Sequence, residues 1–328
     1  MSMFKESVAA AKNFQIATAQ QTIADVPTVF LSFDEPNADE NWAHLKSIAP
    51  ANYKLARVHG VLGFDAAHKA AADQFDSDYV VTVDADNRVD AAFFNKVLPK
   101  NINLGFSYTW AGRQYTNGLL YGNGGLKLWN RQHLLSMNSH ENSADNRDAV
   151  DFCWDALRYK ELPGCYSTVH TNGSAYQAFR VGFREGIKLC LDQGEVIDSS
   201  NMQNEMHAAN YQRLLTWMTV GNDVGYGNWS IYGSRLAVKM LYFENFDYTL
   251  IRNYTWFDEF FKSQENLNPT TESAALSVAV GDIFGFRIPN FTAEESNFIK
   301  RLQLHPEKPL SDDDVKWRTN LKLFGWFN

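Results

Sequence analysis

The sequence predicts an α/β protein in which a mixed sheet is flanked by helices and is followed by a mainly helical C-terminal region. Apolar runs at 28–33, 54–58 and 79–83 are separated by segments of helical periodicity at 39–48 and 65–75. Alternation of strand and helix is typical of parallel sheets, whose ligands bind at the carboxyl ends of the strands. The third run ends in two carboxylates, Asp84 and Asp86, which predicts a site at that edge.

The first strand and the first helix have clear ends. Residues 28–33 read Thr-Val-Phe-Leu-Ser-Phe, which is rich in β-branched and aromatic side chains, and polar residues follow at once from Asp34. Between 39 and 48 apolar residues recur at helical spacing, and Pro50 stops the helix.

The second strand, at 54–58, leads through a loop into a helix rich in small residues. Asp65 can cap this helix, and its alanines allow close packing on the sheet. Its N-terminus offers free N–H groups and a positive dipole to a phosphate. We therefore expect Asp65, His68 and Lys69 to contact a ribose or a diphosphate. The alternative is that His68 and Lys69 are ordinary surface residues.

Beyond residue 90 the pattern becomes mixed. We expect strands at 103–109 and 124–128, a helix at 175–191, and a mostly helical, aromatic-rich chain from about residue 200. No linker or repeat separates the halves. The predicted organisation is an N-terminal strap or helix at 1–26, a catalytic domain at 27–195 and a helical region at 196–328.

Composition limits the classes of protein that this chain can be. It has 328 residues, of which 45% are hydrophobic and 21% charged, which argues against disorder. The net charge of −8 excludes a general polyanion binder. The three cysteines lack metal-site spacing, the start has no signal-peptide pattern, and no run reaches the roughly 18 apolar residues of a membrane span. We expect a soluble cytoplasmic protein with no membrane and no obligate protein partner.

The pair Asp84 and Asp86 is the strongest chemical signal. Side chains at i and i+2 of a strand leave on the same face, so the two carboxylates can converge. Hard oxygen ligands suit Mg²⁺ or Mn²⁺ held together with a substrate diphosphate. The alternative is a simple acidic turn after a strand.

These residues carry a family resemblance. The segment from Gly63 to Asn87, a small-residue helix leading into Asp-Ala-Asp-Asn, resembles the GT-A glycosyltransferase superfamily. The last four residues are similar to the Asp-Thr-Asp-Asn of the procollagen galactosyltransferase and lysyl hydroxylase glycosyltransferase family. The stretch from Phe30 to Trp42 resembles glycosyltransferase-like proteins of large tailed bacteriophages. The GT-A likeness covers residues 28–190, and the bacteriophage likeness extends to about 245.

The resemblance implies a Rossmann-like GT-A domain that binds a nucleotide sugar, most often UDP-linked, together with Mn²⁺ or Mg²⁺. It implies that Asp84 and Asp86 are metal ligands and that His170 completes the set, which favours Mn²⁺ because imidazole suits it better. Asp84 would also serve the donor. The other implied donor-binding residues are Phe33, Asp34 and Glu35 for the nucleoside and Gly124 and Gly125 beneath the sugar.

The acceptor side is implied by the acidic segment that starts at Ala149. Asp151 is the best match to the carboxylate that acts as general base or orients the acceptor hydroxyl, and Asp148 and Asp155 are nearby rivals. The alternative is a set of ordinary helix-terminal acids.

A basic stripe follows on the next expected helix. Arg180, Arg184 and Lys188 stand at i, i+4 and i+8, hence on one face. The stripe suits a phosphate-rich acceptor such as double-stranded DNA, or the donor's own diphosphate. Glu185 neutralises part of it, and a solvated amphipathic helix is the alternative.

These observations predict a metal-dependent glycosyltransferase that moves a sugar to a hydroxyl acceptor. The bacteriophage resemblance makes a hydroxymethylated base, such as 5-hydroxymethylcytosine in phage DNA, an attractive acceptor, with the enzyme then in the host cytoplasm. Protein, glycan and small-molecule acceptors stay open. Nucleotidyl transfer and non-catalytic binding of sugar or nucleic acid are the alternative functions.

Overall fold

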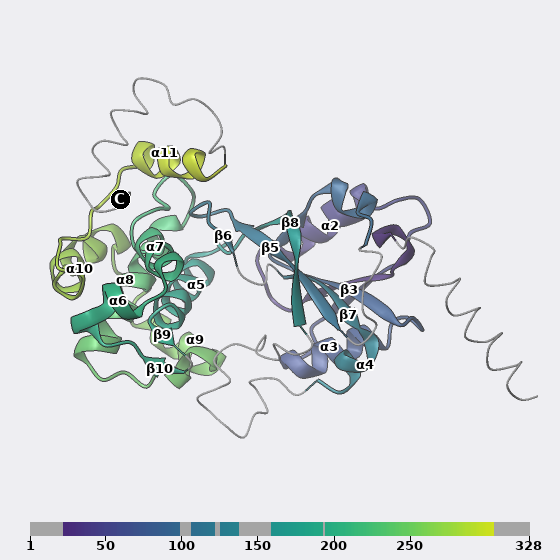
Figure 1. The fold of residues 1–328 in the computed structure, drawn as a ribbon, viewed down its shortest axis with the longest axis horizontal. Helices are drawn as coiled ribbons and strands as arrows, with labels where there is room; N and C mark the ends of the chain where they lie inside the picture. The colour runs from purple at the N-terminus through teal and green to yellow at the C-terminus, as the bar shows by residue number, and fades with distance from the viewer. Residues whose placement is uncertain (1–21, 99–105, 122–124, 138–158, 193, 305–328) are drawn as a thin grey trace, which may run out of the picture.

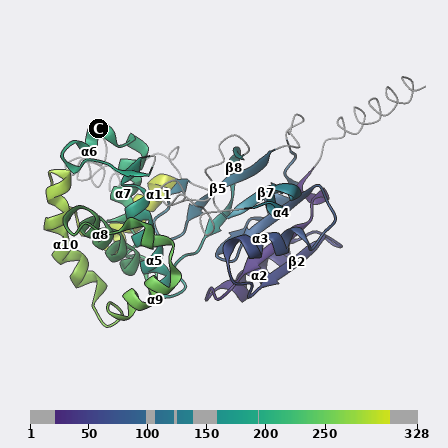
Figure 2. The ribbon, with the colours of Figure 1, turned by 90° about the horizontal axis from the view of Figure 1, so that it is seen from below.

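The protein forms two lobes that lie side by side (Figures 1 and 2). In this computed structural model the described residues are 22–98, 106–121, 125–137, 159–192 and 194–304. One lobe contains a large sheet with helices on its faces, and the other is built from helices. The predicted α/β class with a helical C-terminal region is confirmed.

Among the described residues, the sheet lobe contains eight strands. The order across the sheet is β2 (Leu55–His59), β1 (Thr28–Ser32), β3 (Tyr79–Asp84), β7 (Leu126–Asn130), β5 (Ser107–Gln114), β8 (Tyr159–Val169) and β4 (Asn87–Val89), and β6 (Leu120–Tyr121) pairs with β5. Strands β1, β2 and β3 are parallel, as the alternation of strands and helices predicts. Strand β3 then pairs antiparallel with β7, so the sheet is mixed.

At the far side of the sheet, β4 and most of β8 were not predicted from the sequence, in which only the run before His170 resembles a short strand. Strand β8 is long and irregular, with register shifts against its parallel partner β5, and this breaks the period of two that marks a strand. Strand β4 has only three residues and pairs antiparallel with β8. Its position matters because it begins directly after Asp86.

Helices cover both faces of the sheet (Figure 1). These are α2 (Ala38–Ile48) on one face and α3 (Phe64–Ala72) with α4 (Arg131–Leu135) on the other, with short 3-10 turns at Ile23–Asp25 and Ala91–Asn95. Successive residues of β1 point to opposite faces, so Phe30 packs in the core under α2 and Val29 in the core under α3.

The helical lobe, which also has a smaller apolar cluster of Val220, Phe291, Phe298 and Ile299, packs mainly around a large aromatic-rich core. Its elements are α5 (Ala175–Lys188), β9 (Leu191–Asp192), β10 (Glu195–Val196), α6 (Met202–Glu205), α7 (Ala208–Trp217), α8 (Gly227–Phe243), α9 (Tyr254–Lys262), α10 (Pro269–Phe284) and α11 (Ala293–Leu304), with 3-10 turns at Ser199–Asn201 and Tyr248–Arg252. Phe179, Phe183 and Trp217 are fully buried at its centre. Within the described part of the chain, no helix has the length and apolar character that crossing a membrane requires.

Helices α5 and α8 approach so closely that glycines are required at their crossing. A Cβ on Gly182 would overlap the Ser230 carbonyl, and one on Gly233 would overlap the Phe179 carbonyl. Helix α5 therefore belongs to the helical core. The sheet core includes residues up to Tyr166, and the helical core includes Ala175 and later residues, while the expected domain limit at 195 stays a prediction.

Candidate active site

The two predicted carboxylates lie at the carboxyl end of the central parallel strands. Asp84 is the last residue of β3, and Asp86 precedes β4. The backbone between the strands is fixed on both sides: the Asp84 N–H donates to the Gly125 carbonyl at 2.9 Å, and the His170 N–H donates to the Asp86 carbonyl at 2.7 Å. The tight turn between β3 and β4 is thus held by β7 and by the chain after β8.

Helix α2 supplies a second set of supports, which the sequence reading missed. Asn41 donates to the Ala85 carbonyl at 2.9 Å, Asn37 donates to the His170 carbonyl at 2.8 Å, and His44 bonds the Val89 carbonyl at 2.8 Å. These three polar residues stand at i, i+4 and i+7 of one helical face. That spacing, on the face that meets the sheet, was the available signal.

Three acids form what we call the acidic cluster: Glu35, Asp84 and Asp86. Burial, followed by the negative charges of Asp84 and Glu35, raises the pKa of Asp86 to about 7. The hydrogen bond that the Asn87 side chain donates to Asp86, at 2.7 Å, acts in the opposite direction. The cluster therefore carries crowded negative charge that a cation would stabilise.

A buried lysine lies against this cluster. The Lys127 side chain on β7 is only 1% exposed, and its Nζ lies 3.5 Å from Asp84 Oδ2. Its positive charge also favours the ionised form of Asp86. Lys127 was not predicted as a site residue from the sequence, although a lysine between the apolar residues of a central strand is a visible signal.

The predicted third metal ligand lies elsewhere. The His170 ring stacks on Tyr115 with centroids 4.3 Å apart, and its pKa is lowered by burial and by Arg88, with Glu40 opposing. Among the described residues, no group of three or more His, Cys, Asp and Glu side chains is placed to hold a metal ion. The structure thus does not bring His170 together with the two aspartates.

The residues at the end of β1 border the acidic cluster. Phe33 is 44% exposed, and Asp34 is exposed beside it. The Glu35 carboxylate accepts a hydrogen bond from the Phe33 N–H at 2.8 Å, which fixes the loop. Of these three residues, Glu35 is close enough for its charge to act on Asp86, and the contact of all three with a nucleoside stays a prediction.

The start of α3 differs from expectation. Asp65 and His68 are both buried, so neither has the exposed surface that a ribose or a diphosphate would contact. Burial lowers the pKa of His68 to about 4, and its Nδ1 lies 2.9 Å from the Phe64 carbonyl. Lys69 is exposed on the helix, and its role stays a prediction.

Gly125 has a different neighbour from the one predicted. Its φ is +71°, and an added Cβ would overlap the Asn87 side chain and come within 2.9 Å of Asp84 Oδ2. The missing side chain thus makes room for the acidic cluster itself. Gly124, Asp148, Asp151 and Asp155 lie outside the described residues, so their predicted roles stay predictions.

The three residues of the predicted basic stripe do not form one exposed, unpaired basic surface. Lys188 forms an ion pair with Glu185 at 3.1 Å. The Arg180 guanidinium lies over the Tyr254 ring, 4.4 Å from its centroid, and its Nη1 is buried. Arg184 is partly buried, and its charge also acts on Tyr254. Both arginine side chains therefore lie close to Tyr254, at the start of α9.

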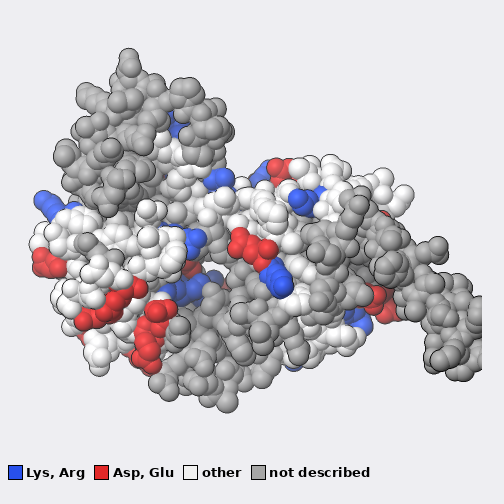
Figure 3. Space-filling model, viewed as in Figure 1, with Lys and Arg blue, Asp and Glu red and all other residues white. Residues whose placement is uncertain are grey.

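The helical lobe faces the acidic cluster across the space between the lobes. Burial lowers the pKa of Arg180, whereas Tyr254, Tyr176 and, with the smallest effect, the Asp86 charge raise it; Glu35 has a correspondingly small effect on the pKa of Tyr254. Figure 3 shows a hollow between the lobes with basic side chains on its helical side. An acidic sheet edge and an arginine-bearing helix thus form the two walls of a cleft.

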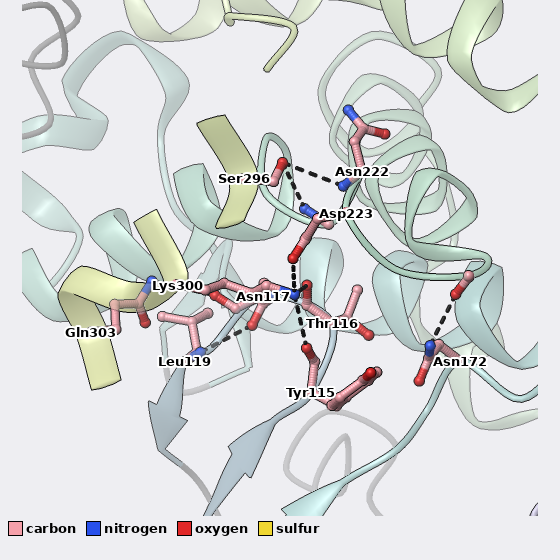
Figure 4. Close-up of polar contacts among 12 residues, drawn as sticks. Tyr115, Thr116, Asn117, Leu119, Asn172, Asn222, Asp223, Ser296, Lys300 and Gln303 are labelled. Atoms are coloured by element: carbon pink, nitrogen blue, oxygen red, sulfur yellow. Dashed lines mark hydrogen bonds and ion pairs between the residues drawn. The ribbon is translucent and has the colours of Figure 1, made fainter. Parts of the chain in front are cut away.

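A polar joint connects the lobes (Figure 4). Lys300 on α11 pairs with Asp223 at 2.6 Å and donates to the carbonyls of Tyr115 and Thr116, each at 3.3 Å. The Tyr115 ring in turn stacks on His170. The joint therefore ties the position of the helical lobe to the backbone that carries Asp86.

Comparisons with known proteins add little. No protein-family model and no curated protein matches the chain. A matching solved structure is described as the crystal structure of a glycosyltransferase involved in the glycosylation of the major capsid of PBCV-1. The match has 16% identity and a TM-score of 0.28, and it covers 42% of this chain and 81% of that one. So weak a match gives no ground for assigning the activity of that protein to this chain. The bacteriophage and collagen-family resemblances stay predictions.

Proposed function

We propose that the protein is a glycosyltransferase that moves a sugar from a nucleotide-sugar donor to a hydroxyl acceptor. The observation that carries the proposal is the Asp84–Asp86 pair at the carboxyl edge of parallel strands, opposite Arg180 of the helical lobe. Ligands of such sheets bind at this edge. A donor with a diphosphate between sugar and nucleoside needs a cation on one side and hydrogen-bond donors on the other.

The residues present fit a divalent cation in part. Asp84 and Asp86 would hold Mn²⁺ or Mg²⁺ through oxygen ligands, and their crowded charge is the feature that favours such an ion. The ion would supply neutralisation of the leaving diphosphate. Asn87 orients the Asp86 carboxylate, and Lys127 holds Asp84 from the buried side.

Residues of the chain itself would bind the nucleoside and activate the acceptor hydroxyl. Phe33 offers an exposed ring on which a nucleobase can stack, and Glu35 can accept hydrogen bonds from the ribose. Asp151, with Asp148 and Asp155 as alternatives, would accept the proton of the acceptor hydroxyl. The new glycosidic bond forms to that oxygen as the bond to the diphosphate breaks.

A hydroxymethylated base in DNA remains the acceptor to test first, on the strength of the sequence resemblance. The structure adds no separate argument for DNA, because Lys188 is neutralised by Glu185 and the Arg180 guanidinium lies against the Tyr254 ring with its Nη1 buried. Duplex containing 5-hydroxymethylcytosine should therefore be compared with peptide, glycan and small-molecule hydroxyls in one assay.

The test is product analysis by mass spectrometry with a panel of nucleotide sugars and Mn²⁺ or Mg²⁺. We expect a hexose or pentose mass on one acceptor class, with release of nucleoside diphosphate. Asp86→Asn should abolish it, whereas Asp76→Asn, an exposed aspartate before the opposite end of β3, should not. Release of pyrophosphate with a nucleotidylated product would instead identify a nucleotidyltransferase. Ligand binding without turnover of any donor would identify a binding protein.

A further inference from the structure

Arg180 has an unused hydrogen-bonding group beside the cleft. Its Nη1 is buried and has no hydrogen-bond partner, and no described carboxylate lies within ion-pair distance of the guanidinium. A buried charged donor without a partner costs free energy unless a ligand satisfies it. The position is otherwise well defined, because the guanidinium is held 4.4 Å from the centroid of the Tyr254 ring.

Tyr254 marks the place where positive charge is concentrated. The charges of Arg180 and, to a smaller extent, Arg184 lower the pKa of Tyr254, so both cations act on one hydroxyl. Tyr254 as a whole residue is 55% exposed, so part of it is open to a ligand. An anion beside this hydroxyl would be attracted by two guanidinium groups.

The opposite wall carries the opposite charge. Asp86 and Glu35 are close enough to act on Arg180 and Tyr254, yet Arg180 forms no ion pair with a described residue. A bare anion in this space would be repelled by the acidic cluster, and a bare cation by the arginines. The ligand that suits both walls has a divalent cation on one side and phosphate oxygens on the other.

We propose that Arg180 and Tyr254 of the helical lobe form a phosphate subsite for a cation-bound diphosphate, with a phosphate oxygen accepting from Arg180 Nη1. The subsite rests on the proposed function and deepens it, because it assigns the helical lobe to the donor. It also replaces the expectation that Arg180 contacts the backbone of an acceptor DNA. The arginine fork matches phosphate geometry, which a lysine does not.

The test is calorimetric titration of the full-length protein with inorganic pyrophosphate in excess Mg²⁺, which needs no knowledge of base or sugar. Arg180→Gln should weaken binding by about 10- to 100-fold, the loss expected for a charge-assisted hydrogen bond. Arg180→Lys should recover only part of it, and Tyr254→Phe should weaken binding less. Lys262→Gln, an equal change of charge at an exposed site on α9, should leave the affinity unchanged.

Three outcomes separate this proposal from the proposed function. Wild-type affinity in Arg180→Gln, with sugar transfer intact, overturns the subsite and leaves the transferase. Weaker binding of hydroxymethylated duplex with unchanged pyrophosphate affinity places Arg180 on the acceptor and also overturns the subsite. A loss of pyrophosphate affinity in Arg180→Gln, in a protein that transfers no sugar, supports the subsite but removes the transferase. Circular dichroism of each variant checks that the fold is kept.

Discussion

Gly125→Ala should disturb the acidic cluster, because the added methyl group would press against Asn87 and Asp84. The glycine has a φ of +71°, and its missing side chain leaves room for Asn87 and Asp84. Gly285 offers a matched control, because its φ is +74° and an added Cβ would meet nothing within 4 Å. The two variants place the same residue in the same backbone conformation and differ in what the new methyl group contacts.

The expected magnitudes follow from these two situations. An alanine in the left-handed region costs about 1–2 kcal/mol at either position. At Gly125 alone, the overlap with Asn87 and the close contact with Asp84 add about 1–3 kcal/mol of overpacking. To relieve that overlap, either the Asp84 carboxylate must move or the Asn87 amide, which supports Asp86, must move. Ligand binding should therefore be weakened as well.

Urea unfolding followed by circular dichroism gives the stability difference, and titration with magnesium pyrophosphate gives the effect on the site. Gly125→Ala should be less stable than Gly285→Ala by about 1–3 kcal/mol and should bind pyrophosphate at least about tenfold more weakly. If both variants lose the same stability and both keep wild-type affinity, the acidic cluster does not depend on this close packing.

Two further predictions concern the joint and the pH dependence. Lys300→Met should cost roughly 3 kcal/mol of unfolding free energy, because it leaves the mostly buried Asp223 carboxylate without its cation. Lys239→Met, which breaks the more exposed pair with Glu244, should cost about 0–1 kcal/mol. Equal losses in urea titrations would contradict the role of the joint. The pKa of Asp86 is about 7 in the folded protein against 3.8 for an ordinary aspartate, so the folded state binds more protons between these values and its stability should decline as pH rises towards about 7. Asp86→Asn should remove that decline, and an unchanged pH profile would argue against the raised pKa.

Local pattern was enough to predict much of the sheet lobe. The strands at β1, β2 and β3 and the helices between them follow from apolar periodicity and from the polar and proline residues that end each run. The position of Asp84 and Asp86 at the carboxyl edge follows as well, because successive parallel strands end at the same side. Helix α5 was also predicted, since its apolar residues keep a helical period over four turns.

Other features were decided by contacts between distant segments. Strand β8 is irregular, so only its pairing with β5 and β4 makes it a strand. His170 was predicted as a ligand, yet the chain after β8 places its ring on Tyr115 instead. Neither result follows from local sequence, because each depends on which strands become neighbours.

The sequence by itself determined that a pair of carboxylates ends a buried strand, because the periodicity of side chains along a strand is a local property. It also placed Arg180 and Arg184 on one helical face. Only the tertiary structure decided what these charges meet: Lys127 beneath Asp84, the Tyr254 ring against Arg180, and the acidic cluster across the cleft from Arg180. The reason is physical, since electrostatic interactions depend on distance and burial in space, and these are set by how the two lobes pack.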